Sequence, residues 1–270
     1  MLYDRLPRTC APFGAEQIAY ATLGAGPAVL LLHGLGGSAD FWRPLADDLA
    51  SRYTLIIPDL LGFGFSSKPS EGYALHRHVA AVAAVLRHSG HAHARAVVGH
   101  SCGGVVALGL LASGLLRAER LALAATPFPS PRFPLRDELL THWYDRTMLT
   151  WQPAAQLIHH ALMFAWPALQ HLGVPPALRG AWAGYMDHTI PSYAGTANGC
   201  IFEANIDPLL PYLPLIPTLL LYSQRDQTVP AIHGARLRGA LPASQLEWLA
   251  GNHYAVLTDG HARLSAWLAA

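Results

Sequence analysis

Positions 95–103 read Arg95-Ala-Val-Val-Gly-His-Ser-Cys-Gly103, an apolar run that leads straight into the pattern G-x-S-x-G. Residues 95–98 are typical of a buried strand, and the apolar residues 102–116 predict a buried helix. A serine in a tight turn between strand and helix, with glycines two positions before and after it, is held exposed in a strained conformation. The stretch therefore predicts a nucleophilic Ser101. The alternative is a glycine-rich turn with an inert capping serine.

Further apolar runs of strand length occur on both sides of this stretch, and they lack the polar alternation of a half-exposed strand. They are Ala28–Leu32, Tyr53–Ile57, Leu121–Ala125, Thr218–Tyr222 and Gln245–Leu249. Helical segments are predicted at Leu75–His88 and Ala231–Leu241 and from Tyr254 to the end. Alternation of strands and helices predicts an α/β fold with a doubly wound, mostly parallel sheet, which binds ligands beyond the carboxyl ends of its strands.

Between residues 127 and 208 no strand pattern is found, while Pro and aromatic residues are frequent. We therefore expect core residues 1–126 and 209–270 to be separated by a helical cap insertion at 127–208. Trp143, Met163, Phe164 and Trp166 are candidates to line an apolar pocket beneath it, because such side chains adapt to varied ligands. The alternative for each of them is a place in the core of the cap.

A second glycine-rich turn, His33-Gly-Leu-Gly-Gly37, ends the predicted strand Ala28–Leu32. Backbone N–H groups that point outward from such a turn can stabilise the oxyanion formed during acyl transfer. The candidate donors are the N–H groups of Leu35 and Cys102. The alternative is a loop that only ends the strand.

A serine nucleophile needs a base, and the base needs a carboxylate that orients it. Asp226 comes just after the strand Thr218–Tyr222, and His253 lies between the last strand and the last helix, so both belong on the same edge of the sheet as Ser101. Rival acids are Asp207 and Asp187 in the cap and Asp259 in the terminal helix.

Five motifs, in order and spacing, resemble the α/β-hydrolase fold superfamily over nearly the whole chain outside the cap. They are His33–Gly37, Asp59–Ser66, Gly99–Gly104, Arg225-Asp226 with Val229-Pro230, and Gly251–His253. The resemblance implies a catalytic triad of Ser101, Asp226 and His253, in the chain order serine, acid, base. The sequence departs from the family pattern at Gln224, where many relatives have glycine, and at Asn252, where a small residue is usual.

The resemblance implies a serine hydrolase that works through an acyl-enzyme, most simply on a carboxylic ester or lactone with an apolar or aromatic acyl group. Ser101 argues against the dehalogenases and epoxide hydrolases of this superfamily, which use an aspartate. One alternative is hydrolysis of carbon–carbon bonds in diketone-type ring-fission products, as in other capped relatives. The other is a ligand-binding or biosynthetic accessory protein on the same fold.

Three further residues near these motifs are expected to support the site without reacting. Asp59 is assigned to the structure of the turn at Gly62–Gly64, because turn aspartates commonly bind their own backbone. His33 is expected to support the oxyanion loop, and His100 to pack beside the nucleophile.

Composition excludes several other classes of protein. The 270 residues are 52% hydrophobic and 13% charged, which requires a packed core, and a net charge of +1 offers no footprint for nucleic acid. Three widely spaced cysteines and 15 histidines show no metal-ligand pattern, so we expect no cofactor and no metal. No apolar run has the length of a membrane span or the form of a signal peptide, which leads us to expect a cytoplasmic protein without stable membrane insertion. The expected partner is a small molecule, and the oligomeric state stays open.

Overall fold

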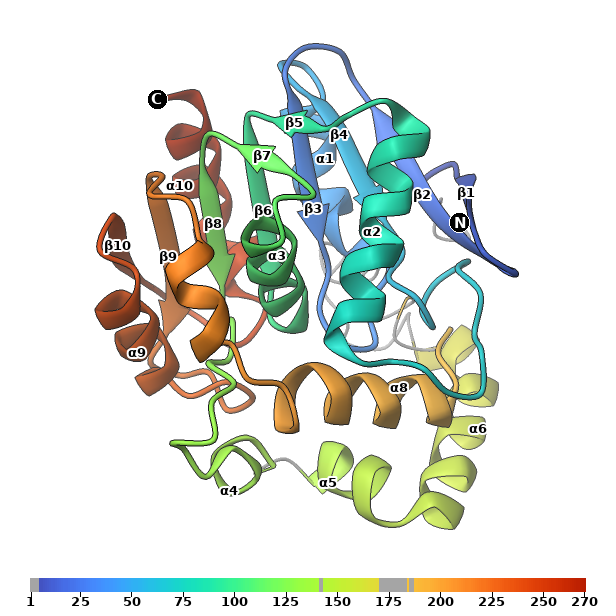
Figure 1. Ribbon diagram of the computed structural model, residues 1–270. Helices are drawn as coiled ribbons and strands as arrows, with labels where there is room; N and C mark the ends of the chain where they lie inside the picture. The colour runs from blue at the N-terminus through green and yellow to red at the C-terminus, as the bar shows by residue number, and fades with distance from the viewer. Residues whose placement is uncertain (1–4, 141–142, 170–183, 185–186) are drawn as a thin grey trace.

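The computed structural model describes residues 5–140, 143–169, 184 and 187–270, and in residues 143–145, 152 and 166–169 the backbone alone. Its centre is a twisted eight-stranded sheet with the strand order β1-β2-β4-β3-β6-β8-β9-β10 (Figure 1). The strands are β1 (Thr9–Phe13), β2 (Glu16–Leu23), β3 (Ala28–Leu32), β4 (Thr54–Pro58), β6 (Ala96–His100), β8 (Leu121–Ala124), β9 (Thr218–Ser223) and β10 (Ser244–Leu249).

The six strands from β4 to β10 in this order pair in parallel, while β1 pairs with β2 and β2 with β4 in antiparallel fashion. This confirms the expected doubly wound, mostly parallel α/β fold. The antiparallel pair β1–β2 at the start of the chain was not predicted. Neither was a second, two-stranded sheet of β5 (His93–Ala94) and β7 (Arg117–Ala118).

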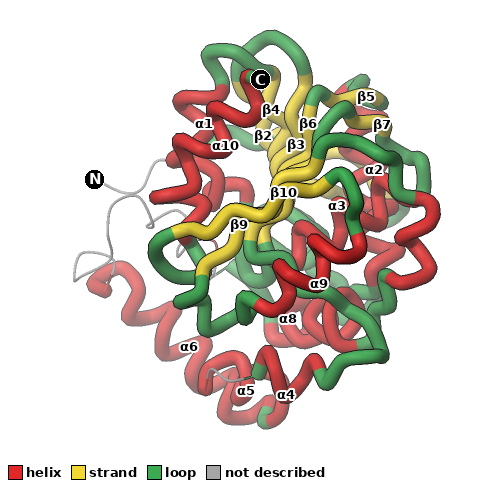
Figure 2. Tube along the Cα trace, turned by 90° about the vertical axis from the view of Figure 1, so that its left-hand side faces the viewer, coloured by secondary structure: helices red, strands yellow, loops and turns green. Residues whose placement is uncertain are grey.

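Both faces of the sheet are buried under helices, which is why its strands are apolar without alternation. Along β3, Leu30 and Leu32 pack into one core, while Val29 and Leu31 pack into the other. Helices pack against both faces, as Figures 1 and 2 show. Those that contribute to the first core are α2 (Leu75–Ser89), α3 (Cys102–Ala112) and α9 (Ile232–Ala240); those that contribute to the second are α1 (Arg43–Leu49) and α10 (Asp259–Ala269).

Helix α3 ends earlier than the sequence predicts, and helix α10 begins later. Helix α3 stops at Ala112 and not at Leu116, because Gly114 adopts a left-handed conformation with φ of 68° that ends the helix. Helix α10 begins at Asp259 and not at Tyr254. A short 3-10 turn at Ala255–Leu257 precedes it, and the Asp259 carboxylate accepts a hydrogen bond from the backbone N–H of Ala250.

Between β8 and β9 the described residues form helices and turns, and none of those described there belongs to a strand. The helices are α4 (Leu135–Leu139), α5 (Trp143–Thr150), α6 (Gln152–Leu169) and α8 (Ile190–Ala197), followed by a π-helical turn at Asn198–Phe202 and a 3-10 turn at Asp207–Tyr212. In Figure 1 these helices lie below the sheet, at the end toward which its parallel strands point. They therefore lie next to the edge at which the predicted site residues gather.

Candidate active site

Ser101 occupies the turn between β6 and α3 in a backbone conformation that non-glycine residues rarely adopt, with φ of 53° and ψ of −125°. The neighbouring glycines allow this turn. A Cβ on Gly99 would lie 2.5 Å from Cα of Gly104, and a Cβ on Gly103 would overlap the carbonyl oxygen of His33. Strand and helix can thus approach closely only with glycine at these positions. The strained backbone is the geometry expected of a nucleophile turn.

His253 and Asp226 lie side by side, with Nδ1 of the imidazole 2.8 Å from Oδ2 of the carboxylate. The other carboxylate oxygen accepts hydrogen bonds from the backbone N–H groups of Thr228 and Val229, at 2.8 and 2.9 Å. Burial raises the pKa of Asp226, but the charge of His253 and these hydrogen bonds outweigh it, so the pKa lies below its usual value. An ionised carboxylate only accepts, so Nδ1 of His253 carries the proton and Nε2 can act as a base.

The three rival acids are all engaged elsewhere. Asp207 accepts from the Ser130 hydroxyl and pairs with Arg132, while Asp187 pairs with Arg5. Asp259, at the start of α10, accepts a hydrogen bond from the backbone N–H of Ala250. Among these four acids, Asp226 is the one whose carboxylate contacts His253.

The loop that follows β3 lies against Ser101. A Cβ on Gly34 would be only 2.9 Å from Cβ of Ser101, and the N–H of Gly37 donates to the Gly34 carbonyl at 3.0 Å. His33 holds this loop, because its Nε2 accepts from the N–H of Leu60 at 2.9 Å and its Nδ1 then donates to the Gly34 carbonyl at 2.8 Å. Burial lowers the pKa of His33 to about 4, which keeps the ring neutral in this role.

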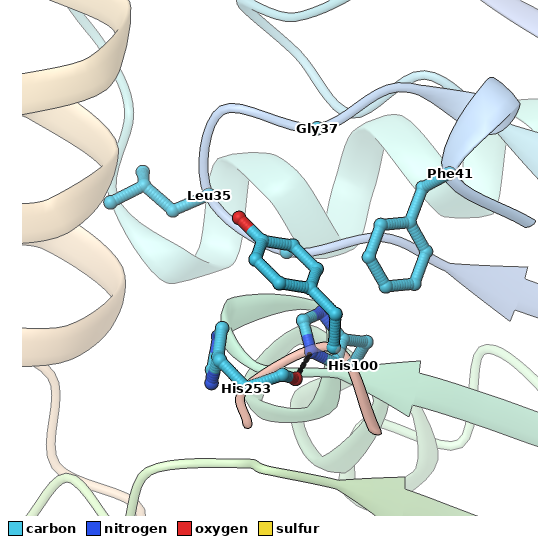
Figure 3. Close-up of a pocket in the computed structure, with 7 residues that line it drawn as sticks. Leu35, Gly37, Phe41, His100 and His253 are labelled. Atoms are coloured by element: carbon cyan, nitrogen blue, oxygen red, sulfur yellow. Dashed lines mark hydrogen bonds between the residues drawn. The ribbon is translucent and has the colours of Figure 1, made fainter. Parts of the chain in front are cut away.

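Cys102 lies at the first position of α3, where backbone N–H groups are unpaired within the helix and the helix dipole favours negative charge. Leu35 belongs to the loop after β3 and lines the pocket across from His253 (Figure 3). The N–H groups of Leu35 and Cys102 stay the predicted oxyanion donors. The side chain of Cys102 is fully buried in the core, so only its backbone can serve this purpose.

A small pocket, with about 30 Å³ of space, opens between this loop and His253. Figure 3 shows Leu35, Gly37 and Phe41 on one side of it and His100 and His253 on the other. Its lining consists of Gly34, Leu35, Gly37, Phe41, His100, His253 and Tyr254. Phe41 and Tyr254 had no predicted role. Their only signal in the sequence is that Phe41 follows the glycine-rich turn and Tyr254 follows His253.

Of the four candidate cap residues, Met163 and Phe164 are not among the described residues that line this pocket. Phe164 is 91% exposed and Met163 is 46% exposed, so these α6 side chains face solvent. The backbones of Trp143 and Trp166 belong to α5 and α6, but their side chains lie outside what the structure describes. An aromatic-rich sequence did not indicate which face of α6 its large side chains would occupy.

Asp59 has a structural role. Its carboxylate accepts hydrogen bonds from the backbone N–H groups of Ala39 and Phe65 and pairs with Arg8.

Within the described part of the chain, no group of three or more His, Cys, Asp or Glu side chains gathers as metal ligands would. In the same part, none of the helices is long and apolar enough to cross a bilayer.

Residues 27–259 match the model of the alpha/beta hydrolase fold family. The pimeloyl-[acyl-carrier protein] methyl ester esterase of Chromobacterium violaceum is 32% identical, over 83% of this chain and 86% of its own. The magnesium-chelatase 30 kDa subunit of Rhodobacter capsulatus is 28% identical, over 87% and 84%. The crystal structure of the esterase RhEst1 from a Rhodococcus species superposes with a TM-score of 0.76 at 24% identity, over 98% of both chains. Proteins with different names share this fold, so the site must decide the function.

Proposed function

The chain belongs to the alpha/beta hydrolase fold family, and on that premise we propose that it is a serine hydrolase that cleaves carboxylic ester or lactone bonds. The proposal rests on the pair of His253 and Asp226, with Nδ1 of the imidazole 2.8 Å from Oδ2 of the carboxylate. His253 lines the pocket, as does His100, the residue before Ser101. A buried carboxylate with a lowered pKa orients the imidazole and stabilises its protonated form.

In the proposed reaction, Oγ of Ser101 attacks the ester carbonyl while its proton passes to Nε2 of His253. The N–H groups of Leu35 and Cys102 stabilise the oxyanion of the tetrahedral intermediate. Collapse of this intermediate breaks the carbon–oxygen bond, and the imidazolium returns the proton to the departing alkoxide. Water, activated by the same imidazole, then cleaves the acyl-enzyme to a carboxylic acid and restores the serine hydroxyl.

The proposed substrate is a small molecule with an apolar or aromatic acyl group. The lining of the pocket supports this, because Leu35, Phe41 and Tyr254 are apolar or aromatic and the described lining contains no Lys, Arg, Asp or Glu. The esterase name of the 32% identical relative supports an ester as the scissile group. We also propose that the helices of residues 127–208 act as a cap over the site, because they lie at the carboxyl ends of the strands.

A panel of p-nitrophenyl esters with acyl chains of two to twelve carbons tests this function, run beside a vinylogous diketone and with Ser101→Ala as the control. We expect turnover of the esters, a preference for one range of acyl lengths, and loss of turnover in Ser101→Ala. Turnover of the diketone without the esters would instead indicate a carbon–carbon hydrolase. No turnover of either by the folded protein would favour an accessory role.

A further inference from the structure

His100, the residue before the nucleophile, has a hydrogen-bond partner that the proposed reaction does not use. Its Nε2 lies 2.9 Å from the backbone carbonyl oxygen of His253, 153 positions away in the chain, as the dashed line in Figure 3 marks. The ring is 2% exposed and ends β6. One residue thus connects the strand that carries the serine to the loop that carries the base.

The protonation of His100 follows from this contact. A carbonyl oxygen only accepts, so Nε2 carries the proton and donates it. Burial, together with the nearby ring of His253, lowers the pKa of His100 to about 3, so the ring is neutral at ordinary pH and Nδ1 holds a lone pair. Within the described residues Nδ1 has no hydrogen-bond partner and faces Gly34. The only hydrogen bond of this imidazole in that part of the chain is therefore the one to the base loop.

The neighbouring rings fix the orientation of this donor. Phe41 stacks on His100 with 4.5 Å between ring centroids and 25° between planes, and Tyr254 is nearly parallel at 6.3 Å. The ring of His253 is 4.6 Å away. At that distance a charged His100 would repel the imidazolium that forms during acyl transfer, whereas a neutral donor does not.

Hydrogen bonds hold the loop around His253, among them one from the N–H of Ala255 to the Asn252 carbonyl at 2.9 Å. The hydroxyl of Ser223 donates to the Gly251 carbonyl, and the side chain of Asn252 accepts from the N–H of Tyr254 at 3.0 Å. His253 itself is held by its side chain through Asp226 and by its carbonyl through His100. Without the second bond the backbone of His253 could rotate about the first.

We propose that His100 is a positioning residue, whose Nε2–H fixes the backbone of His253 so that its imidazole stays aligned between Asp226 and Ser101. The expected effect on catalysis rests on the proposed function. The restraint that His100 places on the loop does not depend on that function. Loss of the donor is expected to lower kcat, because it leaves the imidazole of His253 less well aligned for proton transfer.

The test compares His100→Gln with His100→Met. Neither has a ring and their side chains are similar in length, but only Gln keeps an N–H donor near the position of Nε2. His78→Leu is the matched control, because His78 is also fully buried and hydrogen-bonded, to Thr196, but does not line the pocket. His100→Leu replaces the Met variant if that one does not fold.

Two measurements are made on each folded variant: amide hydrogen exchange of the peptide spanning residues 249–257, and the rate of phosphonylation by a fluorophosphonate. We expect His100→Met to exchange at least tenfold faster in this peptide and to react at least tenfold more slowly. His100→Gln should stay within about threefold of the wild type in both, and His78→Leu should change neither.

The inference would be overturned if His100→Met exchanged and reacted as fast as the wild type. It would also be overturned if the Gln and Met variants were equally impaired, because the ring and not the donor would then matter. Faster exchange with an unchanged reaction rate would overturn its catalytic part. If the wild type does not react at all, the proposed function fails, and the exchange measurement still decides whether His100 restrains the loop.

Discussion

Nδ1 of His253 lies 2.8 Å from Oδ2 of Asp226, and Oδ1 of the same carboxylate accepts two backbone N–H groups. Each carboxylate oxygen is thereby committed, so the carboxylate cannot turn and the imidazole has one orientation. Replacement of Asp226 by Asn keeps the shape of this contact but offers an N–H group to Nδ1, or an oxygen without the charge.

We predict that Asp226→Asn lowers kcat for ester hydrolysis by about 10⁴-fold, because it favours the wrong imidazole tautomer and removes the charge that stabilises the imidazolium. Steady-state kinetics on a p-nitrophenyl ester measure this. Asp207→Asn is the control and should stay within a few-fold of the wild type, because Asp207 binds Ser130 and Arg132. Similar losses in both variants would argue against a special role for Asp226.

Gly103→Ala is expected to destabilise the protein by about 1–3 kcal/mol, because the new methyl group overlaps the carbonyl oxygen of His33 and forces the strand and helix apart. Gly239→Ala is the matched control, since a Cβ there meets nothing within 4 Å and lies in α9. That variant should gain about 0.5–1 kcal/mol from helix propensity. Urea unfolding measures both, and equal stabilities would contradict the close packing at Gly103.

Stability is predicted to fall as the pH drops from 6.5 toward 4. Burial lowers the pKa values of His33 to about 4 and of His78 and His100 to about 3, from an ordinary value of 6.5. In this window the unfolded chain binds protons that the folded chain does not. The free energy of unfolding therefore falls by up to about 1.4 kcal/mol per histidine for each pH unit. Urea unfolding between pH 7.5 and 4.5 measures the slope. His78→Leu should reduce it, and an unchanged slope would sink the assignment of His78 as buried and neutral.

The pocket and the outer face of α6 are predicted to differ in their effect on substrate binding. Phe41→Leu should raise KM for an aromatic ester several-fold, because Phe41 lines the pocket and is 3% exposed. Phe164→Ala should leave KM within twofold, since this side chain is 91% exposed. A large rise in KM for Phe164→Ala would place α6 over the bound acyl group.

Most of the sheet could be predicted because buried parallel strands leave a strong local signal. The run Ala28–Leu32 coincides with β3. The run Tyr53–Ile57 differs from β4 by one residue at each end, and Thr218–Tyr222 is one residue shorter than β9. The β1–β2 pair was missed because its strands are partly exposed and rich in Ala and polar residues. Its one clear signal was Gly14, which takes a φ of 63° at the turn.

The order of motifs predicted Ser101, Asp226 and His253 at one edge of the sheet, because the carboxyl ends of parallel strands share that edge. Contacts that depend on how loops fold back could not be predicted in the same way. The bond from His100 to the His253 carbonyl joins residues 153 positions apart, and no local pattern marks it. The orientation of Phe164 depends on how α6 packs, which its apolar composition does not specify.

The most direct test of the central claim is reaction of the folded wild-type protein with a fluorophosphonate, followed by intact mass and peptide mapping. We predict one phosphonyl group per chain, attached to Ser101, with no labelling of Ser101→Ala. A correctly folded wild type that does not react, or a Ser101→Ala variant that still does, would contradict the role of Ser101 as the nucleophile.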